Sequence, residues 1–188
     1  MIDPMTLPPD LPEPKDDGAA AHLAGLAVPE VCLPATDGTT AALGRSAAPR
    51  TVVYAYPWTG RPGEPALVAD WDLIPGARGC TPETCGFRDH HAELASLGAE
   101  VYGLSTQDTA YQRELVERLQ LPFSILSDAG LELTRELRLP TFEVAGRTLI
   151  KRLTMVIREG VIEHAFYPVF PPDRHAAEVL TWLRERSG

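Results

Sequence analysis

Two short segments of the chain are almost entirely apolar. Residues 51–56 read TVVYAY and residues 101–105 read VYGLS. Apolar side chains in succession, rather than in alternation with polar ones, are typical of a strand buried on both faces, as in a sheet covered by helices. The pattern therefore predicts two central strands, at 51–56 and at 101–105.

Other segments carry apolar residues at helical spacing. In the C-terminal segment Ala176, Val179, Leu180 and Leu183 recur at i, i+3, i+4 and i+7, the spacing of one helix face. Acidic residues that can cap a helix precede several of these segments. The predicted helices lie at 19–26, at 82–97, at 108–119 before Pro122, from the capping residue Asp128 to 137, and after the capping residue Asp173.

The remaining apolar runs predict shorter strands. They lie at 31–33, 41–43, 123–126, 152–157 and 161–167, and the last two are joined through Glu159-Gly160 as a hairpin. Strands and helices in this order predict an α/β fold, a central mixed β-sheet with helices on both faces. We expect a single domain over residues 19–188, preceded by an irregular leader over residues 1–18, which contains five prolines.

Composition narrows the choice of partners. The chain has 188 residues, 44% of them hydrophobic, which suits one packed domain. A formal net charge of −9 disfavours binding to nucleic acid or to an anionic membrane surface. The sequence has neither a run of 18 apolar residues nor the basic and apolar regions of a signal peptide. We therefore expect a cytoplasmic protein with no nucleic-acid or membrane partner.

The three cysteines are Cys32, Cys80 and Cys85. An odd number without an export signal disfavours a framework of structural disulfides and favours a catalytic, redox-sensing or metal-binding role for the close pair. Pro82 suits the first turn of a helix, so Cys80 is predicted at the helix N-terminus. Free backbone N–H groups there are expected to lower the pKa of its thiol and favour the thiolate.

Cys85 follows five residues later in the same predicted helix. Helix geometry separates the Cα atoms of residues i and i+5 by roughly 8 to 9 Å. A disulfide requires Cα atoms closer than about 7 Å. A bond between Cys80 and Cys85 therefore requires the first turns of the helix to unwind.

Residues 79–94, GCTPETCGFRDHHAEL, resemble the active-site segment of the Q-type peroxiredoxins, or bacterioferritin comigratory proteins. The resemblance extends over most of residues 28–187 and implies a thioredoxin-like (peroxiredoxin) fold. It implies that Cys80 is the peroxidatic cysteine and Cys85 the resolving cysteine. It also implies that Arg152, at the start of the predicted strand 152–157, stabilises the thiolate and polarises the peroxide.

The resemblance implies a thiol-dependent peroxidase that reduces hydrogen peroxide and organic hydroperoxides. The intramolecular disulfide would be reduced by thioredoxin or a glutaredoxin-like partner. No metal or organic cofactor is expected, and members of the family occur as monomers and homodimers.

The sequence departs from the family pattern P-x-x-x-T-x-x-C. Pro57 matches the proline of that pattern at the end of the first strand, but it precedes Cys80 by 23 residues instead of seven. We interpret residues 58–77 as the site of an insertion in the active-site loop. Thr59 is the one threonine in that loop and the candidate hydroxyl partner of Cys80, and Pro57 is a candidate pocket residue.

Two other functions fit the cysteines less well. A thioredoxin-like protein-disulfide oxidoreductase or redox sensor would carry C-x-x-C and a cis-proline before the facing threonine, where this chain has four intervening residues and Leu153. Zinc binding by Cys80, Cys85 and one of His90 or His91 lacks a fourth ligand at a familiar spacing. Cys32 is predicted to be a small core or edge residue, with an intermolecular disulfide as the alternative.

Overall fold

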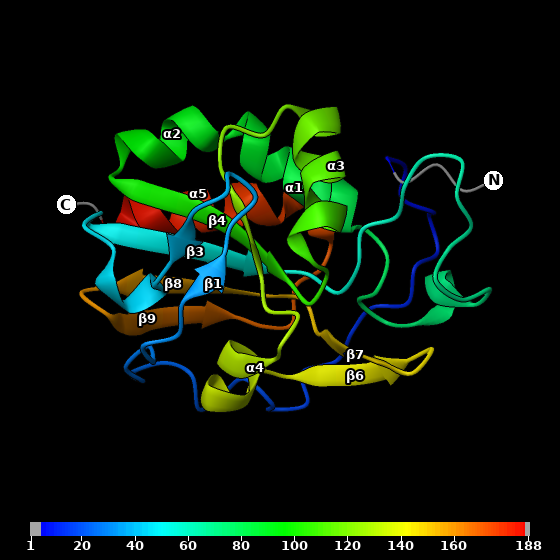
Figure 1. Ribbon diagram of the computed structural model, residues 1–188, viewed down its shortest axis with the longest axis horizontal. Coiled ribbons are helices and arrows are strands. Elements are labelled where there is room, and N and C mark those ends of the chain that lie inside the picture. The colour runs from blue at the N-terminus through cyan, green and yellow to red at the C-terminus, as the bar shows by residue number, and fades with distance from the viewer. Residues whose placement is uncertain (1–4, 187–188) are drawn as a thin grey trace.

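The computed structural model describes residues 5–186, and its centre is a five-stranded sheet with the order β5-β4-β3-β8-β9 (Figure 1). β3, β4 and β5 are parallel, whereas β8 is antiparallel to β3 and β9 is antiparallel to β8. This confirms the mixed sheet with a hairpin at one side. The bounds are β3 (Arg50–Ala55), β4 (Ala99–Ser105), β5 (Ile125–Ser127), β8 (Leu153–Arg158) and β9 (Val161–Phe166).

Helices cover both faces of this sheet (Figure 1), as the sequence predicted. One face packs against side chains from α1, α2, α3 and α5, and the other against α4 and the N-terminal segment. The helices are α1 (Cys80–Asp89), α2 (His91–Ser96), α3 (Thr109–Leu119), α4 (Glu132–Leu137) and α5 (His175–Glu185). None of the helices among the described residues is long and apolar enough to cross a membrane.

The central strand β3 fixes the position of α1. All six of its residues are buried, because it has a strand on each side and a helical or loop layer on each face. Tyr54 stacks on Phe87 of α1 with ring centroids 4.3 Å apart, and its hydroxyl donates a hydrogen bond to Thr84. Burying one such aromatic side chain contributes roughly 1.5–3 kcal/mol. The helix that carries the two cysteines is therefore anchored to the most buried part of the sheet.

One N-terminal prediction was wrong, and another was confirmed with shifted bounds. Residues 19–26 form turns instead of a helix, and the turn at Gly25, with φ +87°, donates a backbone hydrogen bond to Ile162. The short strands predicted at 31–33 and 41–43 are present as β1 (Leu33–Pro34) and β2 (Thr40–Ala41), which pair with each other in a small separate sheet. Prolines at 29 and 34 remove backbone donors, which limits ladder formation there.

Helix boundaries also differ from the prediction. The predicted helix 82–97 is two helices, because the backbone at His90 leaves the helical conformation between α1 and α2. As predicted, Asp128 caps α4. Its carboxylate accepts hydrogen bonds from the backbone N–H groups of Leu133 and Thr134. Asp173 lies in a 3₁₀ turn, Pro172–Arg174, and makes no capping hydrogen bond to α5.

A second hairpin was missed. It comprises β6 (Thr141–Val144) and β7 (Arg147–Ile150), joined by Ala145-Gly146 with φ +49° and +71°. Positive φ at both central positions suits a two-residue hairpin turn, but Ala in place of Asn or Asp hid the signal. The hairpin packs against residues of the 58–77 loop in a small hydrophobic cluster of its own, formed around Trp71, Ala77 and Leu149.

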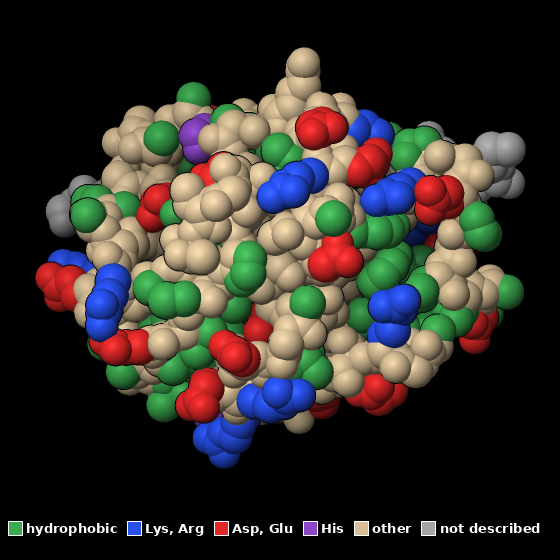
Figure 2. Space-filling view, in the orientation of Figure 1, with side chains coloured by type: hydrophobic (Ala, Val, Ile, Leu, Met, Phe, Trp, Pro, Cys, Tyr) green, Lys and Arg blue, Asp and Glu red, His purple; other side chains and the backbone are tan. Residues whose placement is uncertain are grey.

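The leader and the 58–77 loop lie beside each other at the right of Figure 1. Residues 5–17 contain no helix or strand, and residues 1–4 of the predicted leader lie outside the described residues. The Arg78 side chain donates a hydrogen bond to the Thr6 carbonyl at 2.9 Å, and Pro14 lies against Gly76. Figure 2 shows hydrophobic side chains gathered at the right, where the loop meets β6 and β7. The leader thus covers the segment that leads into Cys80.

Candidate active site

Cys80 is the first residue of α1, and its side chain is buried. Gly79 precedes it with φ +106°, a conformation that L side chains rarely adopt. A Cβ atom on Gly79 would lie 2.3 Å from Cγ of Pro172. The local sequence Gly-Cys therefore allows a sharp entry into the helix and a close approach to the turn before α5.

Replacing Gly79 with alanine is expected to destabilise the fold by about 1–3 kcal/mol, because the new Cβ meets Pro172 and the left-handed backbone is strained. Urea unfolding measures this loss. Gly130→Ala is the matched control, since its Cβ would meet only the flexible end of Glu132 at 3.9 Å. Equal stability of the two variants would contradict the argument.

Arg152 lies just before β8 and faces the sulfur. Its Nη2 atom is 3.2 Å from Sγ of Cys80 and 3.1–3.3 Å from the carbonyl oxygens of residues 76–78. Its Nη1 atom forms an ion pair with Glu83. The guanidinium of Arg152 therefore contacts the Cys80 sulfur, the backbone of residues 76–78 and the carboxylate of Glu83. This is the position that the sequence predicted for Arg152.

Glu83 was missed by the sequence analysis. It is fully buried, pairs with Arg152 through Oε2, and has no hydrogen-bond partner for Oε1 among the described residues. Burial raises the pKa of Glu83, and the charges of Arg152 and His175 oppose that rise. The available signal was its position three residues after Cys80, which places both side chains on one side of the helix.

Burial raises the pKa of the Cys80 thiol, and the Glu83 charge raises it further. The Arg152 charge and hydrogen bonds from Arg152 and the Trp58 backbone act in the opposite direction. The sequence led us to expect a lowered pKa at a helix N-terminus. In this closed arrangement desolvation outweighs that effect, so Arg152 is the main group that favours the thiolate.

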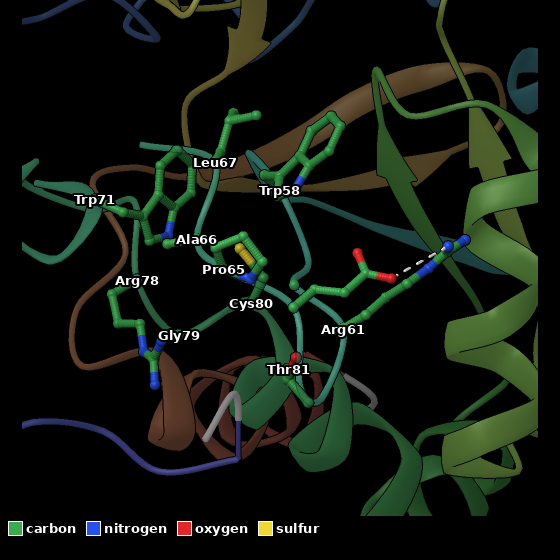
Figure 3. Close-up of a pocket in the computed structure, with 12 residues that line it drawn as sticks. Trp58, Arg61, Pro65, Ala66, Leu67, Trp71, Arg78, Gly79, Cys80 and Thr81 are labelled. Atoms are coloured by element: carbon green, nitrogen blue, oxygen red, sulfur yellow. Dashed lines mark ion pairs between the residues drawn. The ribbon is translucent and has the colours of Figure 1, made fainter. Parts of the chain in front are cut away.

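A cavity of about 40 Å³ opens in front of Cys80. Figure 3 shows Trp58 and Trp71 on either side of it, with Pro65 and Leu67 from the same loop closing the wall. Arg61 and Glu64 form an ion pair 3.8 Å long at the cavity (dashed in Figure 3). The space beside the sulfur accommodates the two oxygen atoms of a peroxide, and the aromatic walls limit access of solvent to the sulfur.

A profile of the redoxin family matches residues 23–180. Peroxiredoxin Q of Populus jackii, a chloroplastic protein, is 32% identical to this chain over 161 residues, which cover 85% of the chain and 67% of the relative. The chain belongs to the redoxin family, among the Q-type peroxiredoxins. Peroxiredoxin Q of Oryza sativa subsp. japonica is also 32% identical, over 85% of this peroxiredoxin and 66% of the relative. The chain thus spans about two thirds of the length of these curated relatives.

Solved structures support the fold of this peroxiredoxin. Peroxidoxin BcpB from Mycobacterium tuberculosis is 27% identical with a TM-score of 0.71, covering 87% of this chain and 98% of that protein. Peroxiredoxin Q from Xanthomonas campestris has a TM-score of 0.70 over 89% and 98% of the two chains, at 23% identity. The predicted thioredoxin-like (peroxiredoxin) fold is confirmed.

Thr59 and Pro57 are both buried in this peroxiredoxin. The Thr59 hydroxyl donates a hydrogen bond to Oε1 of Gln107 at 3.1 Å, and Gln107 donates one back to the Thr59 carbonyl at 3.2 Å. Within the described part of the chain, no hydrogen bond joins Thr59 to Cys80. Thr59 therefore ties the loop to the segment after β4, and its role at the sulfur, like that of Pro57, stays a prediction. Gln107 gave no signal in the sequence.

Cys80 and Cys85 lie in one intact helix, as predicted, and both are free thiols. Cys85 is buried at the other side of the first turns, and burial raises the pKa of its thiol. Cys32 was predicted to be a core or edge residue; it is exposed just before the short strand β1, which excludes the core position and fits the edge position.

The zinc alternative has no support among residues 5–186. They contain no group of three His, Cys, Asp or Glu side chains that could hold a metal ion. His90 pairs with Glu93 at 2.9 Å, and His91 packs against Phe123 with ring centroids 5.8 Å apart. Both histidines therefore have structural partners on the outer side of α1 and α2.

Proposed function

We propose that this peroxiredoxin is a thiol-dependent peroxidase that reduces hydrogen peroxide and organic hydroperoxides. The observation that carries the proposal is the guanidinium of Arg152, 3.2 Å from a buried cysteine sulfur at a helix N-terminus. A positive charge at that distance favours the thiolate and, in the reaction, the negative charge that develops on the peroxide oxygens.

In the first step the Cys80 thiolate attacks the terminal oxygen of the peroxide. A sulfur–oxygen bond forms and the oxygen–oxygen bond breaks, so the sulfur is oxidised to a sulfenic acid and the peroxide is reduced to water or an alcohol. The departing oxygen takes up a proton. The small cavity formed by Trp58, Trp71 and their neighbours holds the substrate against the sulfur.

In the second step the Cys85 thiol attacks the sulfenic acid, a disulfide forms and water leaves. Because both cysteines lie in one helix five residues apart, α1 must unwind over its first turns. Unwinding breaks the contacts of Glu83 with Arg152 and of Thr84 with Tyr54. The reaction therefore alternates between a folded and a locally unfolded active site, an atypical 2-Cys mechanism.

The disulfide is then reduced by a dithiol protein through thiol–disulfide exchange. Thioredoxin or a glutaredoxin-like protein is the proposed reductant, and a monomer or homodimer the proposed assembly. No cofactor takes part in this scheme. The plant relatives named above are chloroplastic proteins, so the cytoplasmic location stays a prediction for this chain.

A protein-disulfide oxidoreductase is the second candidate, and the geometry of the cavity disfavours it. A protein disulfide must bring its own sulfur onto Cys80, which is 3% exposed at the end of a cavity of about 40 Å³. Steady-state consumption of peroxide with a thioredoxin system, compared with reduction of insulin disulfides, separates the two. Insulin reduction without peroxide consumption would overturn the peroxidase.

Cys85→Ser is expected to abolish the intramolecular disulfide while preserving the first oxidation of Cys80, because Cys85 contacts neither the cavity nor Arg152. Mass spectrometry after one equivalent of peroxide should show sulfenic acid trapped at Cys80 in the variant and a disulfide-linked pair in the wild type. Cys32→Ser, at an exposed site, is the control. A Cys80–Cys32 disulfide in the wild type would contradict the assignment.

A further inference from the structure

A second cavity, of about 270 Å³, lies between the leader and the segment that precedes Cys80. Its walls come from the leader, from residues 74–76, from β6, from residues 151–152 and from residues 167–169. It shares no lining residue with the cavity in front of Cys80. The proposed peroxidase chemistry does not use it.

The charged residues that line this cavity are all basic. They are Lys15, Lys151 and Arg152, and no Asp or Glu lines it. Lys151 pairs with Asp17 at 2.6 Å, and Arg152 is occupied by Glu83 and Cys80. Lys15 forms no ion pair with any residue of the described chain. Although the net charge of the protein is −9, the ammonium group of Lys15 at this opening is therefore not held in an ion pair with the described residues.

The rest of the lining is mainly apolar. Ile74, Phe142 and Val169 supply hydrophobic side chains, and three prolines complete the wall. Tyr167 also lines the cavity, but its hydroxyl donates to Asp17 and is not free for a ligand. Apolar walls with a few placed charges are the usual composition of a small-molecule site. A lysine beside apolar walls favours a ligand that has one anionic group and an apolar body.

We propose that this cavity binds a small organic carboxylate, with its charged group at Lys15 and its apolar body between Ile74, Phe142 and Val169. The volume accommodates on the order of ten heavy atoms. Asp16 and Asp17 belong to the same leader, but neither lines the cavity, and the carboxylate of Asp17 is engaged by Lys151 and Tyr167.

The position of the site links it to Cys80. Ile74 and Gly76 line the cavity, and the carbonyls of residues 76–78 lie within hydrogen-bond distance of Arg152. A carboxylate held between the leader and this segment stabilises the folded arrangement of the active site. It therefore slows formation of the Cys80–Cys85 disulfide, a consequence that rests on the proposed function.

Isothermal titration calorimetry of the full chain with octanoate tests the binding, and octanamide is the uncharged comparison. We expect octanoate to bind and octanamide to bind more weakly. Lys15→Gln, at an exposed position, should weaken octanoate binding by about two- to fivefold, the range for a solvent-exposed ion pair. Ile74→Trp should fill the cavity and abolish binding, whereas Leu73→Trp, on the neighbouring side chain that is 75% exposed, should bind normally.

Three results would overturn the proposed site. They are no heat of binding with millimolar octanoate, equal affinity for octanamide, or unchanged affinity in both Lys15→Gln and Ile74→Trp. Because calorimetry requires no peroxide, failure of the peroxidase function would leave this result intact. Rapid-quench measurement of disulfide formation with and without octanoate tests the link, and an unchanged rate at saturation would refute it.

Discussion

Replacing Cys80 with serine lowers the rate of peroxide reduction by about three orders of magnitude or more, the scale expected when a nucleophile is lost. A serine hydroxyl does not ionise near neutral pH, so Arg152 has no anion to stabilise at the helix start. The side chains have nearly the same size, so the buried pocket keeps its shape. Stopped-flow measurement of peroxide consumption with a thioredoxin system gives the rate.

Two matched variants define the result for Cys80. Cys32→Ser removes an exposed thiol and should retain the full rate, and Cys85→Ser should retain the first turnover. If Cys80→Ser consumes peroxide at the wild-type rate, the peroxidase assignment is wrong. If Cys32→Ser loses the activity as well, Cys80 in α1 is not the one cysteine on which peroxide reduction depends.

Arg152→Met is expected to have the second-largest effect, on both activity and stability. Removal of the guanidinium leaves the buried carboxylate of Glu83 without its ion-pair partner, which costs about 3–5 kcal/mol of unfolding free energy. Arg152 lowers the pKa of Cys80, so its loss raises that pKa further. The thiolate fraction at neutral pH falls, and we expect the peroxidase rate to fall about a hundredfold.

A double variant separates the two effects of Arg152. In Arg152→Met combined with Glu83→Gln no buried charge is left unpaired, so urea unfolding should recover most of the lost stability. The rate should stay low, because the cation beside the sulfur is still absent. The rate of Cys80 alkylation is measured as a function of pH in proteins from which Cys32 and Cys85 have been removed. Its midpoint should lie at a higher pH than in the wild type. Recovery of the peroxidase rate in the double variant would show that Arg152 acts only through stability.

The parts of the molecule that local sequence determines were predicted correctly. The successive apolar residues of β3 and β4 require burial on both faces, and the structure places them in the middle of the sheet. Gly79 and Pro82 mark the start of α1 with Cys80 at its first residue. Arg152 was predicted by resemblance, and it lies beside the sulfur because β8 pairs with β3.

The parts that depend on long-range packing were not predicted. Glu83 resembles a solvent-facing helix residue until α5 and Arg152 enclose it. Residues 19–26 have helical composition, but pairing of Gly25 and Ala27 with the β9 region favours turns. Pairing of Thr59 with Gln107 joins residues 48 positions apart, which no local pattern records.

The small cluster around Trp71, Ala77 and Leu149 is separate from the two clusters that sandwich the main sheet. Two residues that line the Cys80 cavity therefore pack in different clusters, Trp71 in the small one and Cys80 in the one beneath α1. Because the smaller cluster contains far fewer buried side chains, we expect it to open at a lower free energy than the whole domain. Substrate entry past Trp71 can draw on this local opening while α1 and the sheet beside Arg152 stay folded.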